Sequence, residues 1–555
     1  MLVFRENRVA VATHLLARTL AEPLASTDRE ALLDALLRAG ELECSLADAG
    51  SPAAAQVADV TDALARHVVN GRLYDAAALI RSLGSLKFPA QVKISPPEGF
   101  AYYALHPLSY AELALECVHQ FGLVAVIGIR SIGTTLSAVV AAAFRGRGVP
   151  AERISVRPTG HPFDRITRFT DEELCWVERE RDAGAHFFVV DEGPGLSGSS
   201  FLSVGEALLR AGVQRAKVTF LCSHEPNPDM LRAYDGAERW SGFRACAIGA
   251  NPHVPAAAAN DLGAGKWREL LYADTEQWPA SWLQMERVKF LSADKRTLFK
   301  FEGLGRFGTA VYDRLRAIAD AGFGPEPQLV DGGFVASPWI AGTPGDPSHI
   351  SESLLNRLAD YCAFRAREFR THSRGNQANL AEMVRCNMRE EFGFEPDLDD
   401  AVLECETPVV VDGRMQPHEW LRSDGGVWLK VDGGSHGDDH FYPGPTDIAW
   451  DLAGTIIEWQ LDHHSEEYFL SRYRRISADD AARRLPCYLR AYSAFRLGYC
   501  KMAAESMDHG PERERLIRGY HRYRRLLSRQ LRTGRSAAQI SGERLQNVAR
   551  GARSG

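Results

Sequence analysis

The chain has 555 residues, more than one hydrophobic core usually holds, so we expect two or three domains. Its 65 basic and 72 acidic residues give a net charge of −7, which argues against a generally nucleic-acid-binding surface. The apolar runs, such as 123–129, are far shorter than the ~20 residues that span a bilayer, and the ten cysteines form no CxxC pair, so we expect a soluble, cytoplasmic protein that does not bind membranes.

Residues 1–92 are expected to form a helical extension. The segments 29–43 and 53–70 place apolar residues at three-and-four spacing, and Ser26, Thr27 and Asp28 offer a helix N-cap. Nothing in this part indicates chemistry. We interpret it as a helical prologue or a dimerisation element, so a homodimer is possible.

Strands then alternate with helices over 93–225. Short apolar runs at 123–129, 153–158, 186–192 and 217–224 are each separated by loops and helix-like segments. Repeated units of this kind predict an α/β fold with a parallel, Rossmann-like sheet. Ligands of such sheets bind at the carboxyl ends of the strands, where two Gly/Ser-rich loops lie.

The sequence HFFVVDEGPGLSGSSF, 186–201, carries the most specific signal in the chain. A strand, a loop of small residues and a helix expose several backbone N–H groups beside the positive end of a helix dipole, which suits an anion. No Lys follows the last Gly, so this is not a Walker loop. Asp191 and Glu192 come just before the loop. A ribose 5-phosphate therefore fits, with its phosphate in the loop and its hydroxyls on the carboxylates.

The run FFVV-DE-GP-GLSGS, 187–199, resembles the signature of type I phosphoribosyltransferases, a resemblance that covers about residues 95–225. It implies that Asp191 and Glu192 hold the ribose of phosphoribosyl pyrophosphate (PRPP). It also implies a phosphate-binding loop made of Gly195, Leu196, Ser197, Gly198, Ser199 and Ser200. Leu196 stands where the family usually has Thr. Gly195 stands where purine-salvage members often have an acid, which makes a simple purine-salvage role less favoured.

The same resemblance assigns two more loops. Residues expected to bind pyrophosphate are Arg130, Ser131, Gly133 and Thr134. A mobile lid after the second strand, 156–169, carries Arg157, His161, Arg165 and Arg168. The implied reaction is displacement at the sugar C1 through an oxocarbenium-like transition state, in which Mg²⁺ and basic groups neutralise the leaving pyrophosphate.

A Pro-, Asn- and Ala-rich stretch, 226–284, is interpreted as a connector or cap, and a different pattern occupies 285–530. GLGRFG, 303–308, has the G-x-G-x-x-G spacing, but no acid ends a following strand, so no dinucleotide site is predicted. HGDDH, 436–440, is more consistent with a loop than with a helical metal pair. Residues 531–555 are expected to be a basic, disordered tail.

Residues 409–434 and 445–454 resemble aminoglycoside and choline kinases, which share the protein-kinase fold. The resemblance implies an α+β domain in which Asp412 is the catalytic base and Lys300 anchors phosphate. Glu419 and Asp432 would bind the metal, and ATP is a possible co-substrate. The pattern departs from that family in three ways. No His-Gly precedes Asp412, Glu419 replaces the metal-binding Asn, and the Gly-rich run follows Lys300.

The predicted protein is a Mg²⁺-dependent phosphoribosyltransferase that moves ribose 5-phosphate from PRPP to a nucleobase-like or heteroaromatic acceptor. Its kinase-like domain would phosphorylate or sense the product. Two alternatives remain open at this point. One is a regulator that binds PRPP without transferring it, and the other is a small-molecule kinase whose first half only binds a ribose phosphate.

Overall fold

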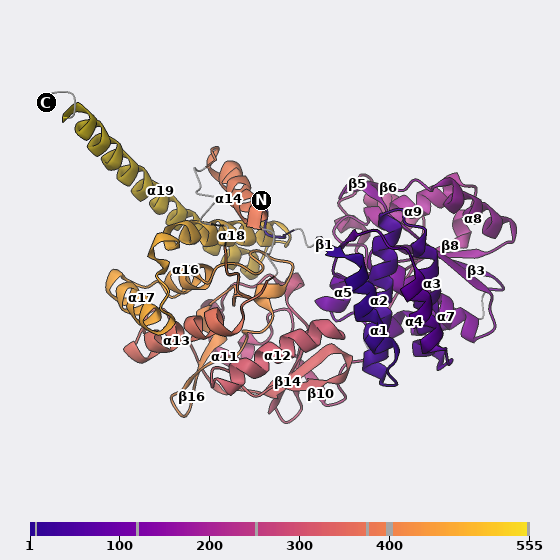
Figure 1. The fold of residues 1–555 in the computed structure, drawn as a ribbon, viewed down its shortest axis with the longest axis horizontal. Helices are drawn as coiled ribbons and strands as arrows, with labels where there is room; N and C mark the ends of the chain where they lie inside the picture. Colours follow the sequence, from indigo (N-terminus) through magenta and orange to yellow (C-terminus); the bar gives the residue numbers. More distant parts are fainter. Residues whose placement is uncertain are drawn as a thin grey trace.

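The computed structural model describes most of the chain. Backbone positions are given for residues 1–5, 8–117, 121–249, 253–372, 377–395, 403 and 405–551. The described chain forms two halves, one built on a parallel sheet and one on antiparallel sheets and helices (Figure 1). No described helix combines the length and the apolar character needed to cross a membrane.

The first half contains a five-stranded parallel sheet in the order β4-β3-β7-β8-β9. Its strands are β3 (Val124–Ile129), β4 (Ala151–Val156), β7 (His186–Val190), β8 (Val218–Cys222) and β9 (Arg244–Ala247). β3, β7 and β8 are buried along their whole length, as expected for continuous apolar strands covered on both faces. The prediction of a parallel α/β sheet is confirmed.

Helices cover both faces of this sheet. Val124, Val126 and Phe188 pack with α6 (Pro107–Cys117) and α7 (Ile132–Gly146). Their chain neighbours Ala125 and Phe187 point the other way, toward α8 (Asp171–Asp182) and α9 (Ser199–Arg210). This alternation follows from the period of two along a strand.

The first 94 residues add four helices and one strand pair. The helices are α1 (Thr13–Leu24), α2 (Arg29–Asp48), α3 (Ala53–Asn70) and α4 (Ala76–Ser85). β1 (Val9–Ala12) pairs antiparallel with β2 (Gln91–Ile94), a contact between segments eighty residues apart that the local pattern does not predict. Helices α2 and α3 pack on α7, so this part covers one face of the parallel sheet.

The stretch 226–284 is divided between two sheets rather than forming a separate connector. α10 (Gly236–Ser241) leads into β9, the edge strand of the parallel sheet. β10 (Ala258–Asp261) forms the edge of the next sheet. Frequent Pro, Gly and Asn residues indicate turns and loops, so the sequence does not predict these two strands.

The second half begins with an antiparallel sheet in the order β10-β11-β12-β14-β13. The other strands of this sheet are β11 (Lys289–Ser292), β12 (Thr297–Phe301), β13 (Gln328–Val330) and β14 (Phe334–Pro338). A second sheet joins β15 (Gly342–Pro344), β16 (Trp420–Ser423) and β17 (Trp428–Lys430). The helices are α11 (Arg268–Leu271), α12 (Arg306–Asp320), α13 (Glu352–Glu368), α14 (Gln377–Phe392), α16 (Ala449–Glu458), α17 (His463–Ser477), α18 (Leu485–Glu505) and α19 (Pro511–Gly551).

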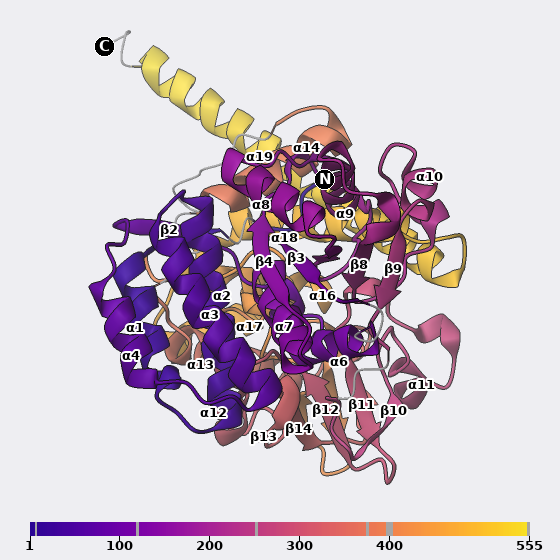
Figure 2. The same cartoon turned by 90° about the vertical axis from the view of Figure 1, so that its right-hand side faces the viewer.

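One of the apolar clusters contains residues of both halves. Phe299, Phe301 and Phe334 of the antiparallel sheet belong to the same buried cluster as α2, α6 and α7 (Figure 2). The GLGRFG run lies at this boundary. The carboxylate of Asp34 on α2 accepts a hydrogen bond from the backbone N–H of Arg306 at 2.9 Å, at the start of α12. The glycine-rich run therefore joins the halves instead of surrounding a ligand.

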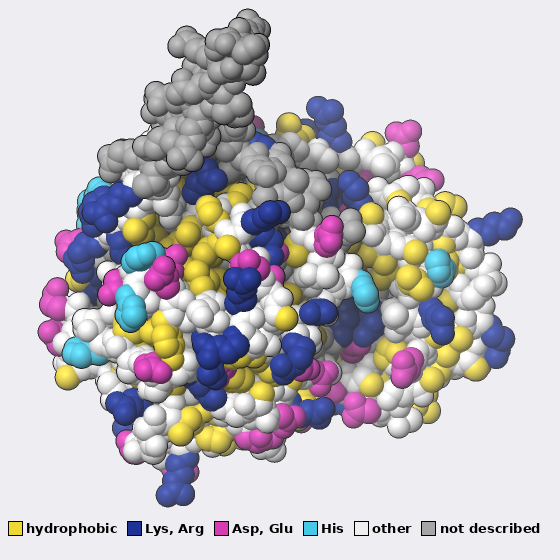
Figure 3. Space-filling view, turned by 60° about the vertical axis from the view of Figure 1, so that its left-hand side comes forward, with side chains coloured by type: hydrophobic (Ala, Val, Ile, Leu, Met, Phe, Trp, Pro, Cys, Tyr) yellow, Lys and Arg dark blue, Asp and Glu magenta, His cyan; other side chains and the backbone are white. Residues whose placement is uncertain are grey.

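The N-terminus lies on the second half, and helix α19 projects away from that half (Figure 1). Val3 is fully buried in the core of that half, and the Phe4 ring stacks on Phe441 at 4.8 Å between centroids. Helix α19 continues to Gly551, through most of the segment for which a disordered tail was expected. On the face seen in Figure 3, Lys and Arg side chains are interspersed with Asp and Glu.

Candidate functional site

The strand order places a topological switch point between β3 and β7. From β3 the chain moves to β4 on one side and then to β7 on the other. Ligands of open parallel sheets bind in the crevice where the strand order reverses in this way. The loops 130–134 and 191–198 follow these two strands and lie side by side there.

Close packing brings the two loops together. A Cβ on Gly133 would lie 2.5 Å from the carbonyl oxygen of Val190, the last residue of β7. Only glycine, which has no side chain, allows the start of α7 to lie this close to β7. The predicted pyrophosphate loop is thereby adjacent to the predicted ribose carboxylates.

Asp191 and Glu192 are held by the backbone and by Tyr110. The Tyr110 hydroxyl donates to their carbonyl oxygens at 2.7 and 2.9 Å. Among the described residues, neither carboxylate forms an ion pair with Lys or Arg. Asp191 accepts the N–H of Glu192 at 2.8 Å, and Glu192 accepts that of Gly99 at 2.9 Å. Both therefore keep acceptor capacity for a ligand.

The pKa values of these acids reflect that environment. Burial raises the pKa of Asp191 to about 7. Burial, with repulsion from Glu98 and Asp191, raises the pKa of Glu192 to about 8. Two neighbouring acids without cationic partners favour a bound cation or hydroxyl donors.

The predicted phosphate loop leads directly into α9. Gly198 has a φ of +68° and precedes the first helical residue, Ser199. The hydroxyls of Ser197 and Ser199 both donate to the carbonyl oxygen of Pro162, at 2.9 and 2.7 Å. Leu196 is 55% exposed, so its side chain adds no polar contact to the loop.

Pro162 belongs to the predicted lid, which forms a hairpin of β5 (Thr159–His161) and β6 (Asp164–Ile166). Its closed position over the phosphate loop means that a bound phosphate would displace the Pro162 carbonyl from the two serine hydroxyls. His161 and Arg168 are exposed, and Arg165 is half-buried.

Arg130, which was expected to bind pyrophosphate, and Arg157, which was expected in the mobile lid, both contact α2. Arg130 donates to Ser155 and lies 3.4 Å from the Asp48 carboxylate. Arg157 forms hydrogen bonds of 3.1 and 2.5 Å with the same carboxylate and also donates to the Arg130 carbonyl at 2.9 Å. Ser131 precedes α7, and Thr134 is fully buried.

A cavity of about 430 Å³ opens beside this loop. Ser131, Thr135 and Arg157 line it together with Arg8, which directly precedes β1, and Lys93 of β2. Sequence reasoning missed these two cations. Neither residue belongs to a sequence motif that indicates binding. Only the pairing of β1 with β2 brings them to the loop.

A second cavity, of about 150 Å³, lies between the antiparallel sheet and the helices of the second half. Lys300 of β12, Glu419 and Asp432 line it, so the structure brings three of the four predicted kinase-like residues together. Lys300 Nζ lies 2.6 Å from Asp432 and 3.2 Å from Glu302.

Asp412 occupies a different position. Its side chain is fully buried and does not line the cavity. It accepts the Tyr361 hydroxyl at 2.7 Å and lies 3.1 Å from Lys430 Nζ. Burial raises the Asp412 pKa, but nearby positive charges lower it by more. The largest of these is the Lys430 ammonium, and the pKa therefore lies below its usual value. These contacts hold the carboxylate inside the protein, away from the cavity.

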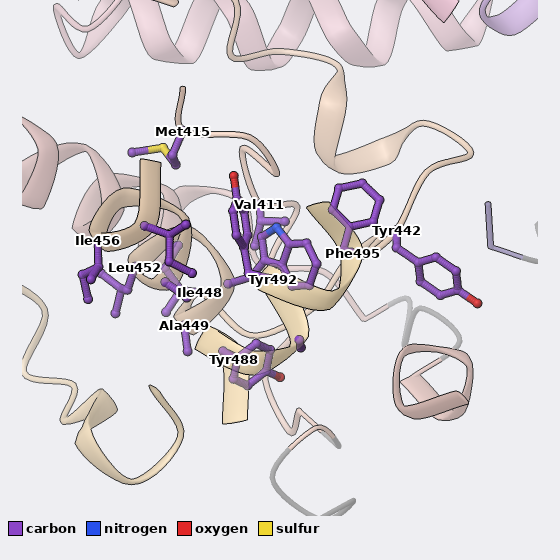
Figure 4. Packing of buried hydrophobic residues seen from close by; sticks show 14 of the residues in the cluster. Val411, Met415, Tyr442, Ile448, Ala449, Leu452, Ile456, Tyr488, Tyr492 and Phe495 are labelled. Carbon is purple, nitrogen blue, oxygen red and sulfur yellow. The ribbon is translucent and has the colours of Figure 1, made fainter. Parts of the chain in front are cut away.

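Helix α16 holds the segment around Asp412 in place. Asp451 on α16 accepts the N–H groups of Asp412 and Gly413 at 2.7 and 2.9 Å. Val411 and Met415 pack among side chains of α16 and α18 (Figure 4). This anchoring leaves Arg414 as the charged residue of the segment that lines the cavity.

Asp412, Glu419 and His436 could form a metal site by proximity, since their ligand atoms lie within 4.8 Å of one another. The charges do not fit a divalent ion, however. Lys430 forms an ion pair with Glu419 as well as with Asp412, and its side chain is fully buried. An ammonium group already neutralises the carboxylates that a metal would need.

A short helix separates the two cavities. In α5 (Glu98–Ala101), Gly99 binds Glu192 of the first site, and Tyr102 and Tyr103 directly after it line the second cavity. The Tyr103 hydroxyl lies 3.2 Å from His440 Nε2. The two candidate sites are thus neighbours across one turn of helix.

No family model and no curated protein sequence matches this chain. Among solved structures, choline kinase LicA from Streptococcus pneumoniae is similar at 16% identity and a TM-score of 0.31, covering 44% of this chain and 89% of that one. A choline/ethanolamine kinase family protein from Mesorhizobium loti is 17% identical over 48% of this chain and 97% of its own, with a TM-score of 0.31. An aminoglycoside phosphotransferase from Alicyclobacillus acidocaldarius is 12% identical over 53% and 98%, with a TM-score of 0.31.

Proposed function

We propose that the first half of the chain binds PRPP with Mg²⁺ and transfers its ribose 5-phosphate to a nucleobase-like or other heteroaromatic acceptor. One observation carries the proposal. Two carboxylates without cationic partners stand beside a helix-opening Gly/Ser loop at the switch point of a parallel sheet. The carboxylates suit ribose hydroxyls, and the backbone N–H groups of the loop suit a phosphate.

The residues of the site divide the ligand between them. The backbone N–H groups of 196–199 and the hydroxyls of Ser197 and Ser199 would hold the 5-phosphate. Asp191 and Glu192 would accept the ribose hydroxyls. Arg157, Arg8 and Lys93 around the first cavity would neutralise charge on the leaving pyrophosphate. The hairpin carrying Pro162 would exclude water during transfer.

The carboxylates also fit the metal. Asp191 and Glu192 offer hard oxygen donors without competing ammonium groups, which is the ligand type that Mg²⁺ prefers. When bound, Mg²⁺ supplies positive charge that stabilises the departing pyrophosphate.

Isothermal titration with PRPP and Mg²⁺ tests this proposal. Wild type should bind, and the double variant Asp191→Asn/Glu192→Gln should bind at least about tenfold more weakly, because amides present donors where the hydroxyls need acceptors. Asp171→Asn at the exposed start of α8 is the control and should bind as wild type does. Equal binding by wild type and double variant, or none by wild type, contradicts the proposal.

Pyrophosphate release separates a transferase from a regulator that only binds PRPP. A transferase should release pyrophosphate from PRPP in the presence of a metabolite extract, and Arg157→Gln should slow that release. Binding of PRPP without release under any extract supports the regulator.

A second candidate function concerns the second half, which we propose binds a nucleotide. Lys300, Arg414 and Arg496 line its cavity beneath the antiparallel sheet, and these cations suit a phosphate chain. ATP turnover that is abolished by Asp432→Asn and indifferent to Asp191→Asn would instead make the chain a small-molecule kinase.

A further inference from the structure

The strand pair β1–β2 has one apolar face and one polar face. Residues directly opposite each other in an antiparallel pair point to the same face, and successive residues alternate between faces. Val11 is paired with Val92, and Val92 packs in the core cluster with residues of α2 and α7. Ala10 is paired with Lys93 on the other face. That face contributes to the lining of the first cavity the residues Arg8, Ala10, Gln91, Lys93 and Ser95.

Arg8 and Lys93 bring positive charge to this cavity that no described acid offsets. Neither side chain has a hydrogen-bond or ion-pair partner among the residues that the structure describes. The lining holds three Lys or Arg side chains and two acids, and both acids, Glu41 and Asp48, already have arginine partners. The first cavity therefore keeps an excess of positive charge, which suits an anion.

Arg130 is placed differently. It was expected from the sequence to bind pyrophosphate, but it does not line this cavity. Its guanidinium donates to Ser155 at 3.1 and 2.7 Å and lies 3.4 Å from the Asp48 carboxylate. An anion would have to compete with these partners for Arg130, whereas the side chains of Arg8 and Lys93 have no partner to give up.

The start of α7 and the lid hairpin lie near the same charges. Ser131 directly precedes α7, Thr135 lies in its first turn, and both line the cavity. A helix N-terminus favours negative charge. Burial lowers the pKa of Arg165 in the lid hairpin, and the charges of Arg157 and Arg8 lower it further. A bound anion would relieve this repulsion between like charges.

The residues just before Arg8 are fixed to the second half. The backbone N–H of Arg5 donates to the His440 carbonyl at 3.0 Å. The Arg5 guanidinium donates to the Asp439 carbonyl at 3.0 and 2.6 Å. Arg5 and Arg8 are three positions apart, so their Cα atoms lie at most about 11 Å from each other. The anchored Arg5 therefore limits where Arg8 can lie.

We propose that Arg8 and Lys93 bind the pyrophosphate group in the first cavity, and that the second half positions Arg8 by anchoring residues 3–5. The inference rests on the proposed PRPP-binding function and gives the second half a part in it. The pyrophosphate site of the first half is incomplete without the second half. The group bound is the same in PRPP and in free pyrophosphate.

Isothermal titration of the full-length protein with inorganic pyrophosphate and Mg²⁺, and separately with PRPP and Mg²⁺, tests the two ligand residues. Arg8→Gln/Lys93→Gln should bind both ligands at least about tenfold more weakly than wild type, because charge-assisted hydrogen bonds are lost. Arg72→Gln/Lys87→Gln removes the same charges from exposed positions outside the cavity and should bind as wild type does.

The two ligands separate the possible failures. Wild-type affinity for both ligands in Arg8→Gln/Lys93→Gln overturns the inference, and PRPP binding by wild type then leaves the proposed function standing. Absence of pyrophosphate binding by wild type also overturns the inference. Pyrophosphate binding that depends on Arg8 and Lys93, without any binding of PRPP, supports the anion site and contradicts the proposed function.

Arg5→Gln tests the anchor, since Arg5 does not line the first cavity. Losing the bonds to the Asp439 carbonyl should weaken pyrophosphate binding about fivefold. In the Arg8→Gln background the same change should add nothing, because the residue that it positions is gone. Arg5→Lys keeps a donor and should recover most of the affinity. Wild-type affinity in Arg5→Gln, or a loss that adds to that of Arg8→Gln, contradicts the positioning. Phe4→Leu, which removes the ring stacked on Phe441, takes its place in the cycle if Arg5→Gln does not fold.

Discussion

At the scale of single residues, Asp191 and Glu192 are acids whose pKa values are raised by burial. Both end a buried strand, and the described part of the chain gives neither an ion-pair partner. Their raised pKa values mean that the folded state binds protons more tightly than the unfolded state does. The contribution of such groups to stability is present below the unfolded pKa and is lost as pH rises through the folded pKa.

Asp191→Asn should therefore stabilise the first half in alkaline solution. The advantage over wild type should grow from about pH 4 to about pH 8 and stay level above that, because the asparagine has no charge to bury. With partial exposure we expect on the order of 1 kcal/mol, or about 2–4 °C in the unfolding temperature. Calorimetry at pH 5 and pH 8 measures it. A variant whose advantage shrinks as pH rises contradicts the assigned burial.

Residue identity predicted part of this site and not the rest. The order of four apolar residues, two acids and small residues locates Asp191 and Ser199 without any structure, since these positions are consecutive. Arg130 was expected to bind pyrophosphate and Arg157 to belong to the mobile lid, and both contact Asp48, which lies more than eighty residues earlier. Local spacing holds no information about such a partner.

At the scale of elements, α5 is four residues long and touches both candidate sites. It can approach the carboxylates because Gly99 has no side chain. A Cβ there would lie 3.0 Å from the Glu192 carboxylate and 2.9 Å from Ile132. The helix is thus fitted to the site by a single glycine.

Gly99→Ala should weaken PRPP binding and lower stability by about 1–3 kcal/mol, the usual range for overpacking. Gly84→Ala on α4 is the control, since nothing lies within 4 Å of its added methyl group, and it should be neutral or slightly stabilising. PRPP titration and thermal unfolding of both variants check this. Wild-type affinity in Gly99→Ala would show that α5 does not constrain Glu192.

The elements also show where a motif misleads. GLGRFG precedes a helix, as a nucleotide-binding loop does, but Asp34 of α2 caps that helix through the N–H of Arg306. The choice between a ligand and a protein carboxylate depends on a residue that lies 272 positions before Arg306. Likewise, Asp412 was expected at the catalytic position from its spacing, and its burial against Tyr361 and Lys430 comes from tertiary packing alone.

At the scale of the whole molecule, contacts between several elements hold the two halves together. They share a core through Phe299 and Phe334, they join at Asp34 and Arg306, and residues 1–5 pack on the second half. The sequence pattern changes from alternating strands and helices to a different pattern, and this change predicted two halves. It could not predict how the two halves contact each other, because residues at an interface between domains do not recur with a regular spacing in the sequence.

Val3→Ala should destabilise the second half by about 1 kcal/mol, since the side chain is fully buried in that core. Val9→Ala on β1 removes the same atoms from a residue that is 50% exposed and should change little. Chemical unfolding of both variants, followed by tryptophan fluorescence, measures the difference. Equal effects would mean that the N-terminal residues do not hold the second half.

A crystal structure of the protein with PRPP and Mg²⁺ tests the central claim most directly. We expect the 5-phosphate at the N–H groups of 196–199, the ribose hydroxyls on Asp191 and Glu192, and the pyrophosphate toward Arg157 and the first cavity. PRPP bound in the second cavity, or a 191–199 loop that stays empty at saturating ligand, would contradict it.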